Sequence, residues 1–382
     1  MKRREIFRLG LAGLAAGAGQ QVWGPVPAAW AAKGGGRAED ELPFDRMAAH
    51  IVRALRPGRG ERAILRHDPK LMAGLLTEVE RQMQAADVIV QSLPYGPAES
   101  FEARLANTDI YVWLPASREA SGQTPGDQAA ALVRWLDSGQ GRQIHFHWAD
   151  GTRDEDSVNG DHGPEYDRVY LDALEVDYAA LDRRMDEAIA KLRSGEVRVT
   201  TQEGTDLRFR LGDRPVCKQN GDASRERMKS ARVRIDREIE LPAGAIRVAP
   251  IEESVKGRIA IPRLDLGGVS VRRIELRVDK GQLKSIDAGL GQEAIRRTIS
   301  ANPALRHFRE FALGMNPKLI KPDGLRWIPY YGYGAGVVRL SLGDNEELGG
   351  AVRGGAVRWF FFPSTTVKVG ETTLVKEGVL SI

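Results

Sequence analysis

Residues 62–91, RAILRHDPKLMAGLLTEVERQMQAADVIVQ, contain two short apolar runs separated by a longer amphipathic stretch. The runs Arg62–Arg66 and Asp87–Gln91 are typical of strands, whereas Lys70–Ala85 has the pattern of a helix. A strand, a helical crossover and a second strand are typical of a parallel sheet. This stretch therefore predicts an α/β fold for the part of the chain around it.

The same alternation continues on both sides of this stretch. Two further strands are expected at Asp109–Leu114 and Arg142–Trp148, and helices are expected at Phe44–Arg56, Asp127–Asp137 and Tyr166–Arg193. The last of these is the longest and is expected to close the unit. Residues 43–195 are thus predicted to form an α/β domain with a mostly parallel sheet.

The pattern changes to a period of two after Gly195. Glu196–Thr201 and Asp206–Leu211 alternate around Gly204, which predicts a hairpin. Strand-like runs recur up to the C-terminus, and only Gly291–Ser300 and Ala304–Leu313 have a helical pattern. Residues 196–382 are therefore predicted to form a β-rich α+β domain. Within it, Arg225–Glu240 alternates charges densely, which is typical of an exposed or edge strand.

The N-terminal residues 1–31 have the pattern of an export signal. Arg3-Arg4 resembles a twin-arginine motif, Leu9–Ala18 is mildly apolar, and Ala29-Trp30-Ala31 offers small residues for cleavage. The alternative is a short basic amphipathic helix, which the glycines and prolines of this stretch disfavour. Residues 32–42 are expected to be a linker. We therefore expect an exported protein, periplasmic or extracellular.

Composition narrows the class of protein. The chain has 382 residues, of which 42% are hydrophobic and 28% are charged. No long apolar run follows the leader, so we expect no transmembrane segment after signal removal. Three of the four net positive charges lie in the leader, so the rest of the chain has a net charge of about +1. This small charge does not predict binding to nucleic acid. Cys217 is the only cysteine, which excludes an intramolecular disulfide and a zinc site built from several cysteines.

Two histidines lie on one face of a predicted strand. His145 and His147 are separated by one residue, and Asp150 joins them only if the chain turns at Ala149. A metal site could be built from these three residues. The favoured interpretation is a pair of neutral imidazoles on a sheet face that hold no metal.

Five segments of the second half occur in a recognisable order. They are Val199–Phe209, Leu241–Gly257, Glu310–Pro317, Gly336–Asn345 and Thr366–Gly370. This order resembles the aminopeptidase T family of metallopeptidases, and the alternation of the first half fits that family's first domain. The resemblance implies a two-domain, usually dimeric protein with two metal ions in the second domain, which would activate a water and polarise a peptide carbonyl.

The family's metal ligands are mostly replaced in this chain. The resemblance implies five ligand positions, occupied here by Ala245, Glu310, Arg339, Arg358 and Phe360, while Tyr331-Gly332 replaces an acidic pair. Of these, only Glu310 is a ligand type. An arginine stays protonated in proteins and repels a divalent cation. We therefore expect no metal cofactor at a degenerate pocket made of Ala245, Glu310, Tyr331, Arg339, Arg358 and Phe360.

Three functional hypotheses follow from this replacement. The favoured one is a binding or scaffold protein for a small anionic or peptide ligand, held by the arginines. A second is a metal-dependent aminopeptidase, or another hydrolase or oxygenase, whose divalent metal site has moved to His145, His147 and Asp150 with Glu310. In the third, the two arginines are purely structural and are ion-paired to Glu310 in a filled pocket.

Overall fold

The computed structural model describes residues 42–116, 125–148, 151–153, 156–159, 164–266, 268–320 and 327–382. Its first half contains a parallel five-stranded sheet in the order β10-β4-β3-β1-β2. The strands are β1 (Arg62–His67), β2 (Ile89–Pro94), β3 (Ile110–Trp113), β4 (Arg142–Phe146) and β10 (Glu238–Leu241). This confirms the predicted α/β class of the first half.

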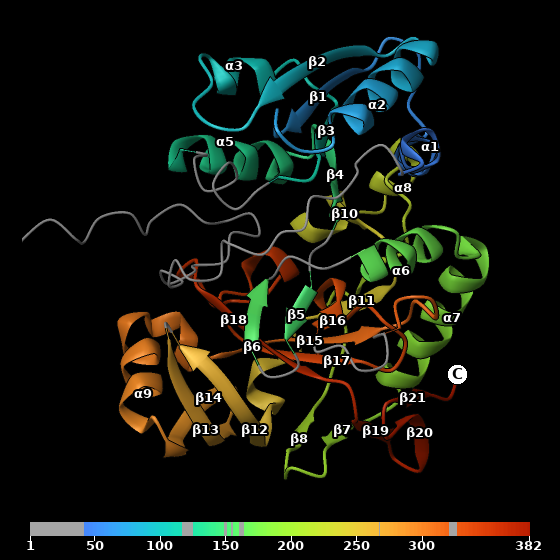
Figure 1. The fold of residues 1–382 in the computed structure, drawn as a ribbon. Helices are drawn as coiled ribbons and strands as arrows, with labels where there is room; N and C mark the ends of the chain where they lie inside the picture. Colours follow the sequence, from blue (N-terminus) through green and yellow to red (C-terminus); the bar gives the residue numbers. More distant parts are fainter. Residues whose placement is uncertain are drawn as a thin grey trace, which may run out of the picture.

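Helices cover both faces of this sheet (Figure 1). On one side are α1 (Phe44–Leu55) and α2 (Ala73–Ala85), and on the other are α3 (Phe101–Leu105) and α5 (Gly126–Asp137). The apolar residues of β1 and β3 are buried between the two layers, as the short hydrophobic runs predict.

The charged segment 225–240 is not one exposed strand. It divides into α8 (Arg225–Met228), the 3-10 turn η3 (Arg234–Arg237) and β10. Strand β10 pairs in parallel with β4 at the edge of the first sheet, and its Ile239 and Leu241 are fully buried. The strand lies at a sheet edge, as predicted. It is not exposed, because the apolar residues between its charged residues pack into a core.

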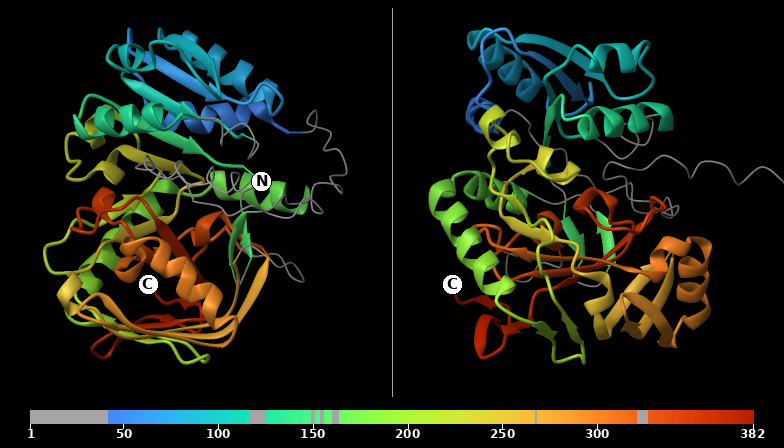
Figure 2. Two further views of the ribbon diagram at one scale, coloured as in Figure 1. Left: turned by 90° about the vertical axis from the view of Figure 1, so that its left-hand side faces the viewer. Right: turned by 180° about the vertical axis from the view of Figure 1, so that it is seen from behind.

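The long helix predicted at Tyr166–Arg193 is two helices. α6 (Pro164–Leu174) ends before Asp177, whose carboxylate accepts the Ala180 N–H and begins α7 (Tyr178–Arg193). Both helices lie along the β-rich half, which also contains the C-terminus (Figure 2).

The second half contains two antiparallel sheets, as its period-two pattern predicts. The five-stranded sheet has the order β18-β17-β15-β11-β9, and the eight-stranded sheet has the order β14-β13-β12-β8-β7-β19-β20-β21. The first is built from β9 (Cys217–Gln219), β11 (Ala245–Val248), β15 (Phe308–Gly314), β17 (Val338–Gly343) and β18 (Val357–Phe362). The second is built from β7 (Val197–Thr200), β8 (Asp206–Phe209), β12 (Lys256–Leu266), β13 (Val269–Asp279), β14 (Gln282–Leu290), β19 (Thr366–Val369), β20 (Thr372–Lys376) and β21 (Val379–Leu380).

One of the two helices expected in this half is wrong. α9 (Gln292–Ala301) forms as expected, but Ala304–Leu313 contains the 3-10 turn η5 (Pro303–Arg306) followed by strand β15. β15 pairs with β11 on one side and β17 on the other, and all of its residues are buried. β15 is buried on both faces and mixes Arg309 and Glu310 with apolar residues, so it lacks the alternation that distinguishes a strand from a helix.

A small third sheet lies near the carboxyl end of β4. It has the order β16-β5-β6, with β5 (Gly151–Arg153), β6 (Asp156–Asn159) and β16 (Trp327–Pro329). The turn η6 (Tyr330–Gly332) follows β16 directly and contacts β5. This sheet therefore brings the segment after β4 next to the turn that carries Tyr331. In the described part of the chain, no helix is long and apolar enough to cross a membrane.

Candidate functional site

Three of the predicted site residues lie on one face of the five-stranded sheet. In the strand register Ala245 faces Gly314, and Ala312 faces both Arg247 and Arg339. Residues paired across neighbouring strands share a face, and Glu310 precedes Ala312 by two positions on β15. Glu310 and Arg339 are therefore brought into contact, whereas Ala245 shares their face but pairs with Gly314, four positions along β15 from Glu310.

Arg358 and Phe360 lie on the opposite face of that sheet. Their register partners are Leu342 and Leu340, and the Arg358 guanidinium donates to the Asp265 carbonyl of β12 at 3.4 Å. The residues of β18 that share the face of Arg339 are Trp359 and Phe361. Neighbouring residues of a strand point to opposite faces, so a shift of one residue in the alignment exchanges the faces. The positions that the resemblance assigns on β18 are thus one residue away from those that share the face of Arg339.

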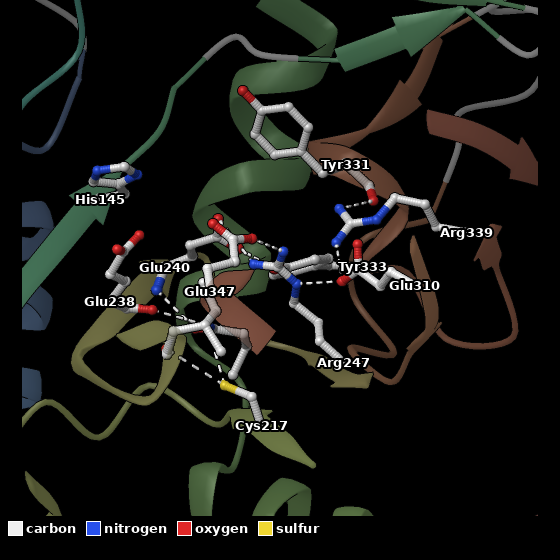
Figure 3. Close-up of polar contacts among 12 residues, drawn as sticks. His145, Cys217, Glu238, Glu240, Arg247, Glu310, Tyr331, Tyr333, Arg339 and Glu347 are labelled. Carbon is white, nitrogen blue, oxygen red and sulfur yellow. Dashed lines mark hydrogen bonds and ion pairs between the residues drawn. The ribbon is translucent and has the colours of Figure 1, made fainter. Parts of the chain in front are cut away.

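Glu310 is fully buried among three guanidinium groups, and Figure 3 shows two of them, those of Arg247 and Arg339. Arg247 Nε donates to its Oε1 at 2.5 Å, Arg339 Nη2 donates to the same oxygen at 3.1 Å, and Arg309 contacts Oε2. Burial alone would raise the pKa of Glu310, but the three arginines together hold that pKa well below its usual range. Glu310 is thus an ionised carboxylate at every physiological pH.

Glu347, on the 3-10 turn η7 (Glu346–Leu348), is a second carboxylate for the same arginines. Arg247 Nη2 donates to Glu347 at 2.8 Å, and Arg309 contacts the same oxygen. We call Arg247, Arg309, Arg339, Glu310 and Glu347 the Arg–Glu network. Its members come from β11, β15, β17 and η7, so the network ties the middle of the sheet together.

A layer of half-buried aromatic rings covers the network. The Tyr331 ring lies 5.2 Å from the ring centroids of both His147 and Trp359. Beneath them, the Arg339 guanidinium lies 4.8 Å from the Trp359 ring and donates to the Tyr331 carbonyl at 3.3 Å. Tyr331 thus lies beside the predicted pocket residues, and it has a left-handed backbone, with φ of 47°.

The two histidines meet a carboxylate that sequence reasoning missed. His145 faces Glu240 in the register of β4 and β10, and ligand atoms of His145, His147 and Glu240 all lie within 4.8 Å of one another. The predicted third member, Asp150, lies outside the described residues. The signal that could have found Glu240 is the apolar alternation of β10, which marks 238–241 as a strand with one charged face.

The electrostatics around this cluster favour a neutral imidazole at His145. Burial, and then His147 and Arg247, lower the pKa of His145 well below its usual value. The Tyr333 hydroxyl donates to Glu240, and Arg247 Nη1 lies 4.0 Å from the other carboxylate oxygen. Two imidazole rings and one carboxyl group are therefore presented together at the boundary of the two halves.

Gln219 connects this cluster to the five-stranded sheet. Its side chain on β9 donates to the Glu238 carbonyl at 2.8 Å and accepts the Glu240 N–H at 2.9 Å. Gln219 is fully buried, so these two bonds fix the backbone of β10 from the side of the second half.

Comparison with solved structures identifies the fold. No protein-family model matches the chain, and no curated protein matches it either. The chain is similar to wild-type AmpT from Thermus thermophilus, with a TM-score of 0.61 and 16% identity over 89% of this chain and 99% of that one. It is also similar to a 2,5-dihydroxypyridine dioxygenase from Pseudomonas putida, with a TM-score of 0.58 and 16% identity over 88% of this chain and 96% of that one.

These similarities show an aminopeptidase T-like fold for this chain. One of these two solved structures is a dioxygenase, and a fold by itself does not select a reaction. The function has to be argued from the residues of the site.

Proposed function

We propose that this chain is a binding or scaffold protein that has the aminopeptidase T-like fold without a dimetal peptidase centre. The observation that carries the proposal is the Arg–Glu network, in which three guanidinium groups surround the buried Glu310. Both of the carboxylates in this network are already paired with cations.

The chemistry of the network disfavours a pair of divalent ions at this position. Arginine has no lone pair to offer a metal and does not lose its proton in a protein. Two divalent ions beside three fixed guanidinium groups would repel them strongly, because the low dielectric of the interior weakens screening. The network therefore supports the hypothesis of structural arginines for Arg339, which is buried and paired with Glu310.

We further propose that the ligand is a small peptide or another small anion, and that the half-buried rings of His147, Tyr331 and Trp359 contact it. Aromatic rings give stacking surface for such a ligand. In a thermal-shift screen of dipeptides with free or amidated C-termini, such a ligand raises the melting temperature of the wild type. Tyr331→Leu should abolish that rise, whereas Tyr178→Leu, a half-buried tyrosine on α7, should keep it.

Export and a homodimer complete the proposal. Arg3-Arg4 and the apolar stretch after it support a twin-arginine leader. The homodimer is proposed only from the resemblance of the sequence motifs to the aminopeptidase T family. A reporter fused to residues 1–41 tests the leader, because Arg3→Lys with Arg4→Lys should block its export.

The test of the central proposal is a metal and activity measurement on untagged protein spanning residues 32–382. The protein is assayed for hydrolysis of leucine amides after loading with zinc, cobalt or manganese. We expect no hydrolysis above the rate of the buffer with the metal alone.

Metal-dependent hydrolysis that Glu310→Gln abolishes and Glu346→Gln leaves intact would overturn the proposal. Glu346 is the matched control because it is a partly exposed glutamate next to the network member Glu347. Two bound transition-metal ions per chain in the wild type would contradict it as well.

A further inference from the structure

We infer that His145, His147 and Glu240 form a binding site for a single divalent first-row transition-metal ion. This site is separate from the position that the resemblance assigns to the dimetal pair. The inference does not depend on the proposed function.

Backbone geometry brings the three side chains together. His145 lies on β4, and His147 follows two positions later, so a period of two directs both to one side. β10 runs parallel to β4 with Glu240 opposite His145. The ligand atoms lie within 4.8 Å of one another, and a tetrahedral ion at about 2.1 Å from each ligand needs them roughly 3.4 Å apart. Small side-chain rotations on a fixed backbone close this difference.

The surrounding residues hold the candidate ligands in position. The His147 N–H donates to the Leu241 carbonyl at 3.0 Å, and the Glu240 N–H donates to Gln219 at 2.9 Å. The Tyr333 hydroxyl donates to one Glu240 oxygen, and the Trp113 ring lies against the His145 ring with centroids 5.2 Å apart. Hydrogen bonds and packing of this kind orient ligands in known metal sites.

The donor set selects the class of ion. Two imidazoles and one carboxylate suit zinc, cobalt or iron, whereas calcium and magnesium prefer oxygen ligands alone. Three protein ligands also leave coordination positions open for a water or a substrate atom.

The guanidinium of Arg247 lies close to this site. Its Nη1 lies 4.0 Å from a Glu240 oxygen, but its charge is already shared between Glu310 and Glu347 (Figure 3). Arg247 lies between Glu240 and Glu310, so Glu310 is not a ligand of the site formed by His145, His147 and Glu240.

The experiment is a titration of untagged residues 32–382 with cobalt(II), followed by its visible d–d absorption and by calorimetry. We expect one cobalt per chain. His145→Gln and Glu240→Gln should each weaken binding by at least about tenfold, because each removes one ligand. The glutamine of Glu240→Gln still accepts from Tyr333, which keeps that contact of the fold. His307→Gln is the control and should bind like the wild type.

Absence of saturable binding to the wild type would overturn the inference, as would equal binding by the wild type, His145→Gln and Glu240→Gln. Folding of each variant is checked by its melting temperature without metal. If a variant folds poorly, the melting temperature of the wild type is measured with and without zinc instead. Bound zinc should raise this temperature, and the absence of a rise would overturn the inference. Binding of two ions that requires Glu310 would instead contradict the proposed function, so the two failures are distinguishable.

Discussion

Glu310 is buried among guanidinium groups, and the cost of desolvating its charge is offset only while those groups remain in contact with it. The neighbouring strands supply these groups through Arg247 and Arg339, while Arg309 comes from β15 itself. A single carboxylate therefore controls the balance of charge in the centre of the sheet.

Glu310→Gln should destabilise the fold by about 3–5 kcal/mol, because it leaves buried guanidinium groups uncompensated. Glu346→Gln removes a partly exposed pair with Arg353 and should cost under about 1 kcal/mol. Urea unfolding of both variants at neutral pH measures these values. A loss below about 1 kcal/mol for Glu310→Gln would show that the network does not depend on this charge.

Glu310→Gln should also change how the stability of the protein depends on pH. The pKa of Glu310 lies below its ordinary value of 4.5 in the folded protein, so its contribution to stability is full above that value and falls as the pH decreases below it. The wild type should therefore lose more stability in acid than Glu310→Gln, whose site has no proton to take up. Equal acid dependence of the two proteins would contradict the paired state of Glu310.

At the scale of elements, the end of β15 and the turn η6 depend on close backbone contact. A Cβ placed on Gly314 would lie 2.0 Å from the Gly334 carbonyl oxygen and 2.5 Å from that of Gly332. No side chain fits there, because backbone on both sides would have to separate. Gly314 therefore allows the turn that carries Tyr331 to pack directly against the central strand.

Gly314→Ala should lower stability by about 1–3 kcal/mol, because the added methyl group overpacks this contact. The shift of η6 should also weaken any ligand that binds the ring layer. Gly58→Ala is the matched control, since its Cβ meets only atoms 3.8 Å or more away. Thermal unfolding of both variants checks the prediction, and equal melting temperatures would contradict it.

The whole molecule is held together by a strand that crosses between its two halves. β10 follows β9 in the chain, yet it completes the first sheet beside β4. Gln219 binds the backbone of β10 on both sides of Ile239, at Glu238 and Glu240. Folding of the first sheet is therefore coupled to the second half.

Gln219→Leu should leave the Glu238 carbonyl and the Glu240 N–H without their partner, at a cost of about 1–3 kcal/mol for each group. We expect faster hydrogen exchange at the His147 amide, which bonds to Leu241 of β10. Exchange at Leu340, in the middle of β17, serves as the internal reference. Unchanged exchange at His147 would show that β10 is held without Gln219.

Much of the fold follows from local pattern. The alternation of apolar runs and helices predicts the parallel sheet of β1 to β4, and the period of two after Gly195 predicts antiparallel sheets. Errors arise where pattern is weak, at the buried strand β15 and at the break between α6 and α7. β15 mixes Arg309 and Glu310 with apolar residues and shows no period of two, while the helical spacing of apolar residues continues across the polar break at Glu175 and Asp177.

The sequence by itself determined the class of each half and the histidine pair on one strand face, and the family resemblance placed Glu310 and Arg339 in one pocket. Only the tertiary structure decided that Arg247 and Arg309 also enclose Glu310, and that Glu240 joins His145. The physical reason is that a strand's period fixes which face a side chain takes, whereas its partners depend on which distant strands lie alongside. Glu240 is 95 residues from His145 in the chain, and only the pairing of β10 with β4 brings them together.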